Sequence, residues 1–466
     1  MFLDIDKKAP DNLAFVDDSR TRVTYGELVK FTEDFAKRMT SRTLTAVICR
    51  NTTGSAAGFV ACMSNHIVPL LIGASLDAAM RDSLLKEYSP EYLWAPSDME
   101  LGTSAEPVFS AYGYDLIKTR MEPPRMYKEL SMLLTTSGST GSPKLARHSY
   151  KNVEANAKHI ADFFGLDKSE RAMLDLPMQY TYGLSVLYSH LFAGAQVILS
   201  EKHVVELDYW NLFREYEATS ITGVPYCYEM LKKLRFTRMN LPTLRTLSQG
   251  GGKLSEDLQK EFAEYAKSTG RRFFVTYGAT EATARMAFLP PELASVKLGS
   301  IGGPIPDGKL YIADENDQII NTPGTVGELV YEGPNVTLGY AEKAEDLILG
   351  DERHGILHTG DMAKRDEDGY FYIVGRKKRF LKIFGSRVSL DEIENMLKTR
   401  FGMDFACVGR DDEMKIFVTT PSMDNEIISF LTDKLHFNKT AFTVCVIPEI
   451  PKNDAGKTLY AMLGGL

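Results

Sequence analysis

The sequence predicts an α/β fold: a large N-terminal domain of α/β layers plus a β-rich subdomain, with a small α+β C-terminal domain. Apolar strand-like runs alternate with helical periods up to about residue 280, a pattern typical of parallel strands joined by helices. From about residue 297 to 375, short strands separated by Gly, Pro and Asp-Gly turns take over. At 466 residues the chain is too long for one core and should form at least two domains. We expect domains at 1–376 and 377–466.

The first elements are predicted from capping and periodicity. Thr24 followed three residues later by Glu27 is typical of a capping box. Leu28, Phe31, Phe35 and Met39 recur behind it at helical spacing, so a helix should begin here. The next three segments predict a strand–helix–strand unit with parallel strands, at residues 45–49, 55–64 and 68–72.

Later segments continue this alternation. A strand at residues 131–134 precedes a small-residue loop, and a helix should follow that loop. Further strands are expected at residues 171–176, 195–200, 218–224, 244–249 and 271–278. Asp368-Gly369 between aromatic strands predicts a hairpin. In the C-terminal domain we expect helices at 390–398 and 425–435 and strands at 405–408 and 415–420.

Composition limits the classes of partner. The formal net charge of −8 argues against non-specific binding to nucleic acid or anionic membranes. No apolar run is long enough to span a bilayer, and the N-terminus shows no apolar signal-peptide core. The five cysteines are odd in number and scattered without CxxC spacing, so reduced thiols in a cytoplasm are expected.

The segment at residues 133–144, LLTTSGSTGSPK, predicts a phosphate-binding loop. Small residues let backbone N–H groups approach a phosphate, and Lys144 adds a point charge. The candidate phosphate ligands before that lysine are Thr136, Ser137, Gly138, Ser139, Thr140 and Gly141. The spacing is not that of a P-loop, and a flexible linker is the alternative interpretation.

A second candidate segment, Tyr277-Gly278-Ala279-Thr280-Glu281, follows an apolar strand. Loops at the carboxyl ends of parallel strands are where open α/β sheets bind ligands. There the aromatic could stack on a base, the hydroxyl could reach a phosphate, and the carboxylate could hold Mg²⁺. An ordinary strand-to-helix turn is the alternative. The glycines Gly250, Gly251 and Gly252 also follow a strand, and they leave room for a bulky group; a turn before the helix at Ser255 is the alternative.

These segments, in this order, resemble the adenylate-forming superfamily of acyl-CoA synthetases, stand-alone adenylation domains and luciferases. The resemblance covers the phosphate loop, the Y-G-x-T-E segment, Thr359-Gly360-Asp361, Gly375-Arg376 and the stretch from Pro451 to Lys457. It implies a two-domain enzyme whose small domain is mobile, with ATP and Mg²⁺ as cofactors.

The resemblance also implies roles for individual residues. It places Tyr277 and Gly278 with Gly250 and Gly251 around the adenine, Thr280 at the α-phosphate, and Glu281 on the metal. Asp361 and Arg376 would contact the ribose, and Lys378 would be the hinge. Lys457 would be carried to the α-phosphate and the carboxylate as a catalytic cation. For Lys377 and Arg379, a solvated basic turn is the alternative interpretation.

Departures from the family pattern bear on the substrate. Tyr180 replaces a His that gates the acyl pocket in many acyl-CoA synthetases. Thr181 stands where amino-acid adenylation domains place an Asp for the substrate ammonium, so α-amino acids are not expected. The expected acyl pocket consists of Tyr180, Thr181, Tyr182 and Gly252, and an aryl or aliphatic acid fits it better.

The implied function is activation of a carboxylic acid to acyl-AMP with release of pyrophosphate, then transfer to a thiol. CoA is favoured as the acceptor, with a phosphopantetheinyl carrier protein in trans as the alternative. An adenylate-using oxygenase or an amide-forming enzyme would share these motifs. A non-catalytic nucleotide-binding module is disfavoured by the presence of Lys144, Glu281, Asp361 and Lys457 together.

Overall fold

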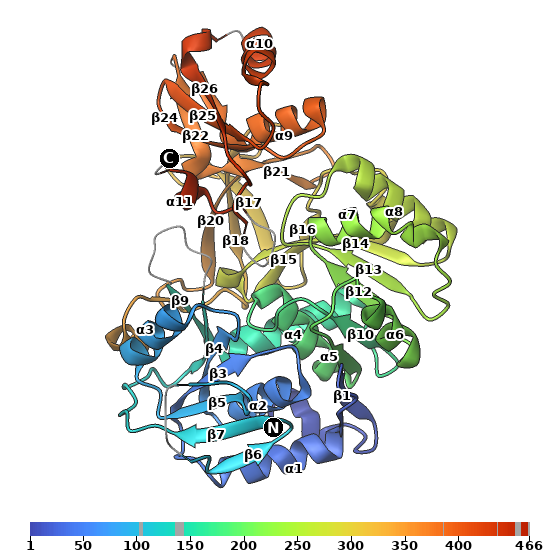
Figure 1. Ribbon diagram of the computed structural model, residues 1–466, viewed down its shortest axis with the longest axis vertical. Helices are drawn as coiled ribbons and strands as arrows, with labels where there is room; N and C mark the ends of the chain where they lie inside the picture. Colours follow the sequence, from blue (N-terminus) through green and yellow to red (C-terminus); the bar gives the residue numbers. More distant parts are fainter. Residues whose placement is uncertain (102–105, 136–143, 385, 436, 453–457, 465–466) are drawn as a thin grey trace. The chain divides into compact units, whose positions relative to one another are not determined.

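The structure is a computed structural model that describes residues 1–101, 106–135, 144–384, 386–435, 437–452 and 458–464. Two compact units make up these residues, and each is described by itself (Figure 1). The first holds the chain up to Thr135, from Lys144 to Lys309, and Glu332–Leu357. The second holds Leu310–Tyr331 and the chain from His358 onward.

A nine-stranded sheet forms one half of the first unit, in the order β16-β15-β14-β13-β12-β10-β11-β1-β2. Strands β1 and β10 to β14 are parallel to their neighbours, and β2, β15 and β16 add antiparallel edges. The strands are β1 Leu13–Asp17, β2 Arg22–Thr24, β10 Arg171–Leu174, β11 Gln196–Leu199, β12 Ser220–Gly223, β13 Thr246–Gln249, β14 Arg272–Ala279, β15 Ala284–Leu289 and β16 Gly303–Pro304.

An eight-stranded sheet forms the other half, in the order β19-β9-β8-β4-β3-β5-β7-β6. Its centre is parallel, and β6, β7, β9 and β19 are antiparallel to their neighbours. The strands are β3 Leu44–Cys49, β4 Val68–Gly73, β5 Tyr92–Pro96, β6 Phe109–Ala111, β7 Tyr114–Lys118, β8 Leu130–Thr135, β9 Leu145–Ser149 and β19 Gly339–Ala341.

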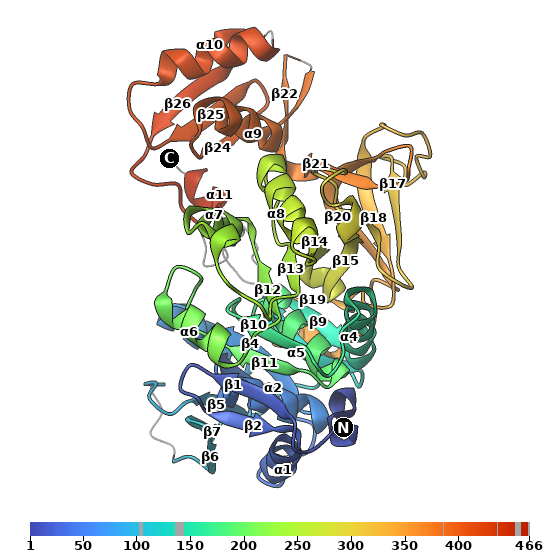
Figure 2. The ribbon, with the colours of Figure 1, turned by 90° about the vertical axis from the view of Figure 1, so that its right-hand side faces the viewer.

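Helices join these strands and pack against the two sheets (Figures 1 and 2). One continuous apolar core contains side chains of both sheets and of α1, α2, α4 and α5. A second core, on the other face of the eight-stranded sheet, includes α3. The helices are α1 Tyr25–Ala36, α2 Thr53–Ser64, α3 Ala78–Tyr88, α4 Tyr150–Phe164, α5 Thr181–Ala193, α6 Leu207–Glu215, α7 Pro225–Lys233 and α8 Glu256–Ser268, with 3₁₀ turns η1 Phe2–Lys7, η2 Phe236–Arg238, η3 Thr280–Ala282, η4 Pro291–Leu293 and η5 Ala344–Ile348.

The capping box predicted at the start of the first helix is confirmed. The Glu27 amide donates to Thr24 Oγ1 at 3.2 Å, and Glu27 Oε2 accepts from the Thr24 amide at 2.8 Å. The helix ends at Ala36, so the prediction that Met39 continues it is wrong. Met39 follows the helix and packs against the same core.

The second unit contains a four-stranded sheet, a two-stranded sheet and a three-stranded sheet, in the orders β17-β18-β20-β21, β22-β23 and β24-β25-β26. The hairpin predicted at Asp368-Gly369 is confirmed, because it joins the antiparallel strands β20 and β21. The strands are β17 Lys309–Ala313, β18 Gly327–Glu332, β20 Ile356–Arg365, β21 Phe371–Arg376, β22 Phe380–Ile383, β23 Ser386–Ser389, β24 Ala406–Arg410, β25 Glu413–Val418 and β26 Phe442–Val446.

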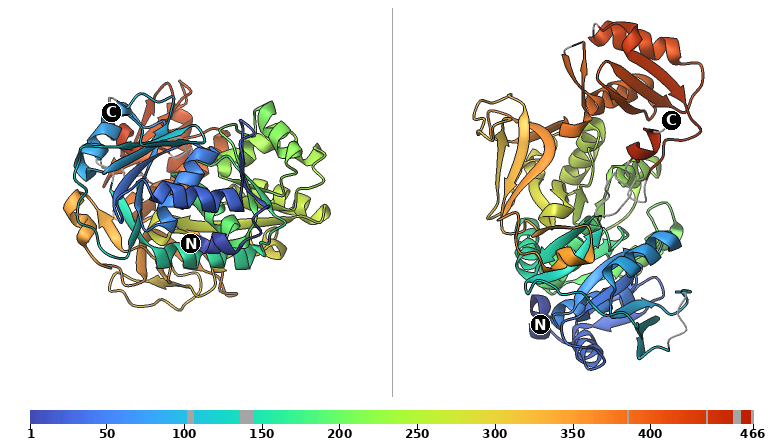
Figure 3. Two further views of the ribbon diagram at one scale, coloured as in Figure 1. Left: turned by 90° about the horizontal axis from the view of Figure 1, so that it is seen from below. Right: turned by 90° about the vertical axis from the view of Figure 1, so that its left-hand side faces the viewer.

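Helices α9 Leu390–Phe401 and α10 Asp424–Leu435 share an apolar core with the strands β24, β25 and β26 (Figures 2 and 3). The turns η6 Lys377–Arg379 and η7 Lys439–Ala441 and the short helix α11 Tyr460–Leu463 complete this unit. The structure thus confirms the predicted α/β class with a β-rich part and an α+β tail. The predicted boundary after residue 376 stays a prediction.

No helix among the described residues is long and apolar enough to cross a membrane.

Candidate active site

The Y-G-x-T-E segment lies at the end of β14, at one edge of the nine-stranded sheet. Tyr277 and Gly278 directly precede Ala279, the last residue of that strand, and Thr280 and Glu281 lie in η3. A Cβ atom at Gly278 would lie 1.5 Å from the carbonyl oxygen of Ala284 on β15. Only glycine permits this close approach of two backbones, so Gly278 fixes the turn that presents Glu281.

Glu281 is held by residues far along the chain. The Tyr340 hydroxyl donates a hydrogen bond to Glu281 Oε1. Arg353 Nη1 donates to the Glu281 backbone oxygen at 3.2 Å, and its guanidinium lies 4.6 Å from the Tyr340 ring centroid. Burial, followed by the charge of Glu281, raises the pKa of Tyr340 to about 12. The hydroxyl therefore stays protonated and keeps donating to the carboxylate.

Lys144 lies in the same neighbourhood. It comes directly before β9, and the first two residues of that strand pair with Ala341 and Tyr340 of β19. Lys144 Nζ lies 2.5 Å from Glu342 Oε1 and 5.9 Å from the Tyr340 ring centroid. The chain thus brings the lysine of the predicted phosphate loop near the carboxylate predicted to bind metal. Sequence reasoning missed Tyr340 and Arg353, because nothing in their local sequence indicates contact with residues near 281.

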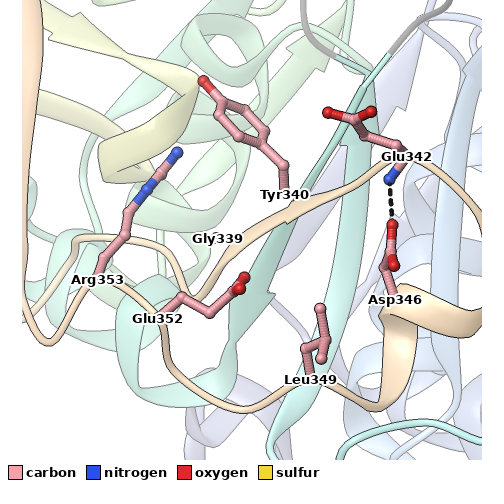
Figure 4. Close-up of a pocket in the computed structure, with 7 residues that line it drawn as sticks. All are labelled: Gly339, Tyr340, Glu342, Asp346, Leu349, Glu352 and Arg353. Atoms are coloured by element: carbon pink, nitrogen blue, oxygen red, sulfur yellow. Dashed lines mark hydrogen bonds between the residues drawn. The ribbon is translucent and has the colours of Figure 1, made fainter.

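A cavity of about 440 Å³ opens beside these residues (Figure 4). All of its lining residues belong to Glu332–Leu357, the segment of the first unit that follows β18. Inside it, Asp346 accepts a hydrogen bond from the Glu342 amide at 2.9 Å (Figure 4). The lining residues are Gly339, Tyr340, Glu342, Asp346, Leu349, Glu352 and Arg353.

The predicted acyl-pocket residues are also brought together. Tyr182 Oη lies 3.3 Å from Ser248 Oγ on β13 and 3.4 Å from Thr276 Oγ1 on β14. A Cβ at Gly250 would lie 2.6 Å from Thr276 Oγ1 and 2.8 Å from Tyr182 Oη. Gly250 is therefore required for the packing of Tyr182. The space beside Gly250, which the sequence indicated was open for a substrate group, is filled by the side chains of Tyr182 and Thr276.

The remaining members of this group lie close by. Gly251 has a φ of +75°, and a Cβ built there would be 3.3 Å from Tyr180 Oη. A Cβ at Gly252 would lie 3.1 Å from Pro225. Thr181 is the first residue of α5 and is buried. Both tyrosines thus reach the glycine segment.

Asp361 and Arg376 lie in the second unit, opposite each other on β20 and β21. Arg376 Nε lies 2.6 Å from Asp361 Oδ1. The carboxylate is nearly buried, and the guanidinium is exposed on one side. Together they present a carboxylate and a forked donor at one edge of the hairpin, a pair able to bind vicinal hydroxyls.

The predicted hinge, Lys378, lies in η6. Both of its neighbours form ion pairs, and Arg379 is largely buried. Lys377 Nζ pairs with Glu328 at 2.7 Å. Arg379 pairs with Asp391 and Glu394 at 2.5 and 2.6 Å and lies 3.6 Å from the Tyr460 ring centroid. The alternative interpretation of the run as solvated is therefore wrong for Arg379.

Seven predicted site residues lie outside the described residues: Thr136, Ser137, Gly138, Ser139, Thr140, Gly141 and Lys457. Among the residues that the structure does describe, no group of three or more His, Cys, Asp or Glu could hold a metal. One carboxylate is nevertheless enough for Mg²⁺ that is bound mainly by substrate phosphates. Glu281, oriented by Tyr340, fits that role.

This fold and this arrangement of motif residues define an AMP-binding enzyme. Residues 3–341 match the family model described as "AMP-binding enzyme". The chain therefore belongs to the AMP-binding enzyme family, and the predicted membership of the adenylate-forming superfamily is confirmed.

Three known proteins illustrate the similarity. The chain is 31% identical over 347 residues to a 2-succinylbenzoate–CoA ligase of Oceanobacillus iheyensis, covering 72% of this chain and 70% of that one. It is 30% identical to a long-chain-fatty-acid–CoA ligase of Salmonella typhimurium, covering 73% of this chain and 62% of that one. An o-succinylbenzoate CoA synthetase from Bacillus subtilis, solved with ATP and magnesium, matches with a TM-score of 0.81 and 22% identity, covering 99% of this chain and 98% of that one. That last likeness shows a shared fold.

Proposed function

We propose that this enzyme activates a carboxylic acid with MgATP, forming acyl-AMP and pyrophosphate, and then transfers the acyl group to a thiol. The observation that carries the proposal is Glu281, held by Tyr340 beside Lys144. Membership of the AMP-binding family and the CoA-ligase relatives support the same reaction class.

In the first half-reaction, the substrate carboxylate attacks the α-phosphorus of ATP, and pyrophosphate leaves. Mg²⁺ bound through Glu281 would neutralise charge that develops on the phosphates. Lys144 would exchange its ion pair with Glu342 for the leaving phosphates, which carry more charge than one carboxylate. The loop of Thr136 to Gly141 would supply backbone donors. Thr280, next to Glu281, would contact the α-phosphate.

The nucleoside contacts proposed here are those that the family resemblance implies. Tyr277 would stack on the adenine, with Gly278, Gly250 and Gly251 around it. Asp361 and Arg376 would contact the ribose, the carboxylate as acceptor and the guanidinium as donor. The ion pair between them supports this, because it already positions both groups at one strand edge.

Lys457 would act only in the first half-reaction, as a cation on the transferred phosphate and the attacking carboxylate. The small domain would then rotate about Lys378 and withdraw it. In the second half-reaction a thiolate attacks the carbonyl carbon of acyl-AMP, and AMP leaves. CoA is the proposed acceptor, supported by the CoA ligases among the relatives. A carrier protein in trans is the alternative.

The acid would bind against Tyr180, Thr181, Tyr182 and Gly252. An aryl or aliphatic acid is proposed over an α-amino acid, because no carboxylate is predicted where an α-ammonium would lie. The proposal also includes a reducing compartment such as the cytoplasm, supported by the five cysteines, none of which is in a disulfide.

The test is release of pyrophosphate from ATP in the presence of aryl, short-chain, long-chain and amino acids, followed by mass spectrometry with CoA added. We expect release that depends on one class of non-amino acid, and a thioester once CoA is present. Release without thioester formation would transfer the acceptor role to a carrier protein or an amine. Absence of release with every acid would contradict the proposal.

A further inference from the structure

A buried arginine lies beside the proposed acyl pocket, and no carboxylate among the described residues balances its charge. Arg285 lies on β15, opposite Gly278 of the Y-G-x-T-E segment. It is only 2% exposed. Among the described residues, nothing accepts a hydrogen bond from its Nε or Nη1, and no carboxylate pairs with it. A guanidinium carries five N–H donors and remains charged in proteins.

The surroundings of Arg285 are aromatic. Its guanidinium carbon lies 4.9 Å from the ring centroid of Tyr182 and 4.9 Å from that of Phe164. Such cation–π contacts are worth about 2 kcal/mol when desolvated, whereas burying an unpaired charge costs several kcal/mol. Two ring faces therefore do not offset the burial of this charge, and a further partner is required.

The neighbouring polar groups do not provide that partner. Burial raises the pKa of the Tyr182 and Tyr188 hydroxyls, so both remain neutral. The single proton of Tyr188 Oη is directed at Asn156 Oδ1, at 2.8 Å, or at the Thr283 backbone oxygen, at 2.7 Å. Burial lowers the pKa of His190 to about 4, so this ring is neutral too. The cluster therefore keeps the positive charge of Arg285.

Tyr182 connects this charge to the proposed substrate site. Its hydroxyl reaches Gly250 and Thr276 at the strand ends, while its ring faces Arg285. We propose that Arg285 binds a second carboxylate of the acid substrate, so that the enzyme selects dicarboxylic over monocarboxylic acids. This inference rests on the proposed function, and it deepens that function by naming the substrate class. A carboxylate is matched to a guanidinium in shape and charge.

The test compares Arg285→Met and Arg285→Lys with the wild-type enzyme. The substrates are aliphatic dicarboxylates from malonate to sebacate and the benzenedicarboxylates, each against its monomethyl ester. Hydrogen bonds to charged groups are worth about 1.5–3 kcal/mol, which corresponds to about 10–100-fold in affinity. We expect the wild-type preference for a diacid over its ester, as kcat/KM for pyrophosphate release, to fall about 10–100-fold in Arg285→Met. Arg285→Lys should keep part of it.

Two further measurements separate recognition from a structural role. Without ligand, Arg285→Met should melt at the same temperature as the wild type or higher, because removing an unpaired buried charge is neutral or stabilising. The preferred diacid alone should raise the Tm of the wild type but not of Arg285→Met. Arg272→Met is the matched control. Arg272 also lies over an aromatic ring, but it donates to Phe164 O at 2.6 Å and Thr246 Oγ1 at 2.8 Å, so its loss should leave the preference unchanged.

Three outcomes would overturn the inference: equal use of diacids and esters by the wild type, an unchanged preference in Arg285→Met, or a lower Tm or failure to fold of ligand-free Arg285→Met. If no acid supports pyrophosphate release, the proposed function fails on its own. The Tm measurement needs no turnover, so it still decides whether Arg285 binds a diacid.

Discussion

Glu281 depends on a tyrosine that lies 59 positions further along the chain. The Tyr340 hydroxyl fixes one carboxylate oxygen, and Arg353 fixes the backbone of the same residue. A carboxylate that must hold Mg²⁺ against a polyphosphate needs such orientation, because an unrestrained glutamate would lose side-chain entropy on each binding event. Tyr340 is therefore a positioning residue.

We predict that Tyr340→Phe raises the KM for MgATP about tenfold, since a hydrogen bond to a charged group is worth about 1.5–3 kcal/mol. Raising the Mg²⁺ concentration should restore part of the loss, which a purely structural defect would not show. The measurement is initial velocity against MgATP at several Mg²⁺ concentrations.

Tyr228→Phe is the control for this change. Tyr228 is also buried, and its hydroxyl finds no partner among the described residues. Removing that hydroxyl should leave KM unchanged and stability unchanged or higher. Equal KM values for wild type and Tyr340→Phe would exclude the positioning role.

At the scale of elements, the turn that follows β13 determines which side chains can pack beside it. The turn after β13 must be free of side chains, because Tyr182 of α5 and Thr276 of β14 meet at Gly250. The sequence indicated that three consecutive glycines clear a space, but it could not show which group fills it. The filling tyrosine comes from a helix 68 positions earlier in the chain.

We predict that Gly250→Ala lowers the free energy of unfolding by about 1–3 kcal/mol, the usual cost of overpacking a core. The added methyl would displace the Tyr182 hydroxyl, so the KM for the acid should rise as well. Urea unfolding and acid titrations measure the two effects. Gly303→Ala is the control, because a Cβ at Gly303 would meet nothing within 4 Å. Equal stability of the two variants would show that Tyr182 is not held there.

Local patterns predicted many elements of this chain correctly. The capping box at Thr24 and Glu27 and the hairpin at Asp368-Gly369 are encoded within a few residues, and both form as predicted. The end of α1 was missed because Met39 keeps helical spacing after the helix has stopped at Ala36. Helix ends are set by packing as well as by periodicity.

At the scale of the whole molecule, the alternation of strands and helices predicted the α/β class but not the number of sheets. Periodicity reports which face of an element is buried, and it does not report which sheet a strand joins. Residues 332–357 illustrate this limit. They follow β18 in sequence, yet they belong to the first unit and supply β19, Tyr340 and Arg353. The sequence predicted candidate motif residues, but it did not indicate Tyr340 and Arg353, which hold Glu281.

The two half-reactions give a prediction for the role of Lys457. Lys457→Ala should slow adenylation about 10²–10³-fold, the usual cost of losing a donor that acts in the transition state. It should barely affect thiolysis of preformed acyl-AMP. Lys452→Ala is the matched control: Lys452 pairs with Asp404 at 2.7 Å on the surface, so both rates should stay near wild type. Equal slowing of both half-reactions would exclude a role confined to adenylation.

The central claim is that an acid oxygen becomes bonded to the α-phosphorus of ATP. It is tested most directly with the best acid substrate, labelled with oxygen-18 in its carboxyl group, in a complete reaction with ATP and CoA. The account predicts that one labelled oxygen per turnover is found in AMP and none in pyrophosphate. Label in inorganic phosphate with formation of ADP, or unlabelled AMP, would contradict it.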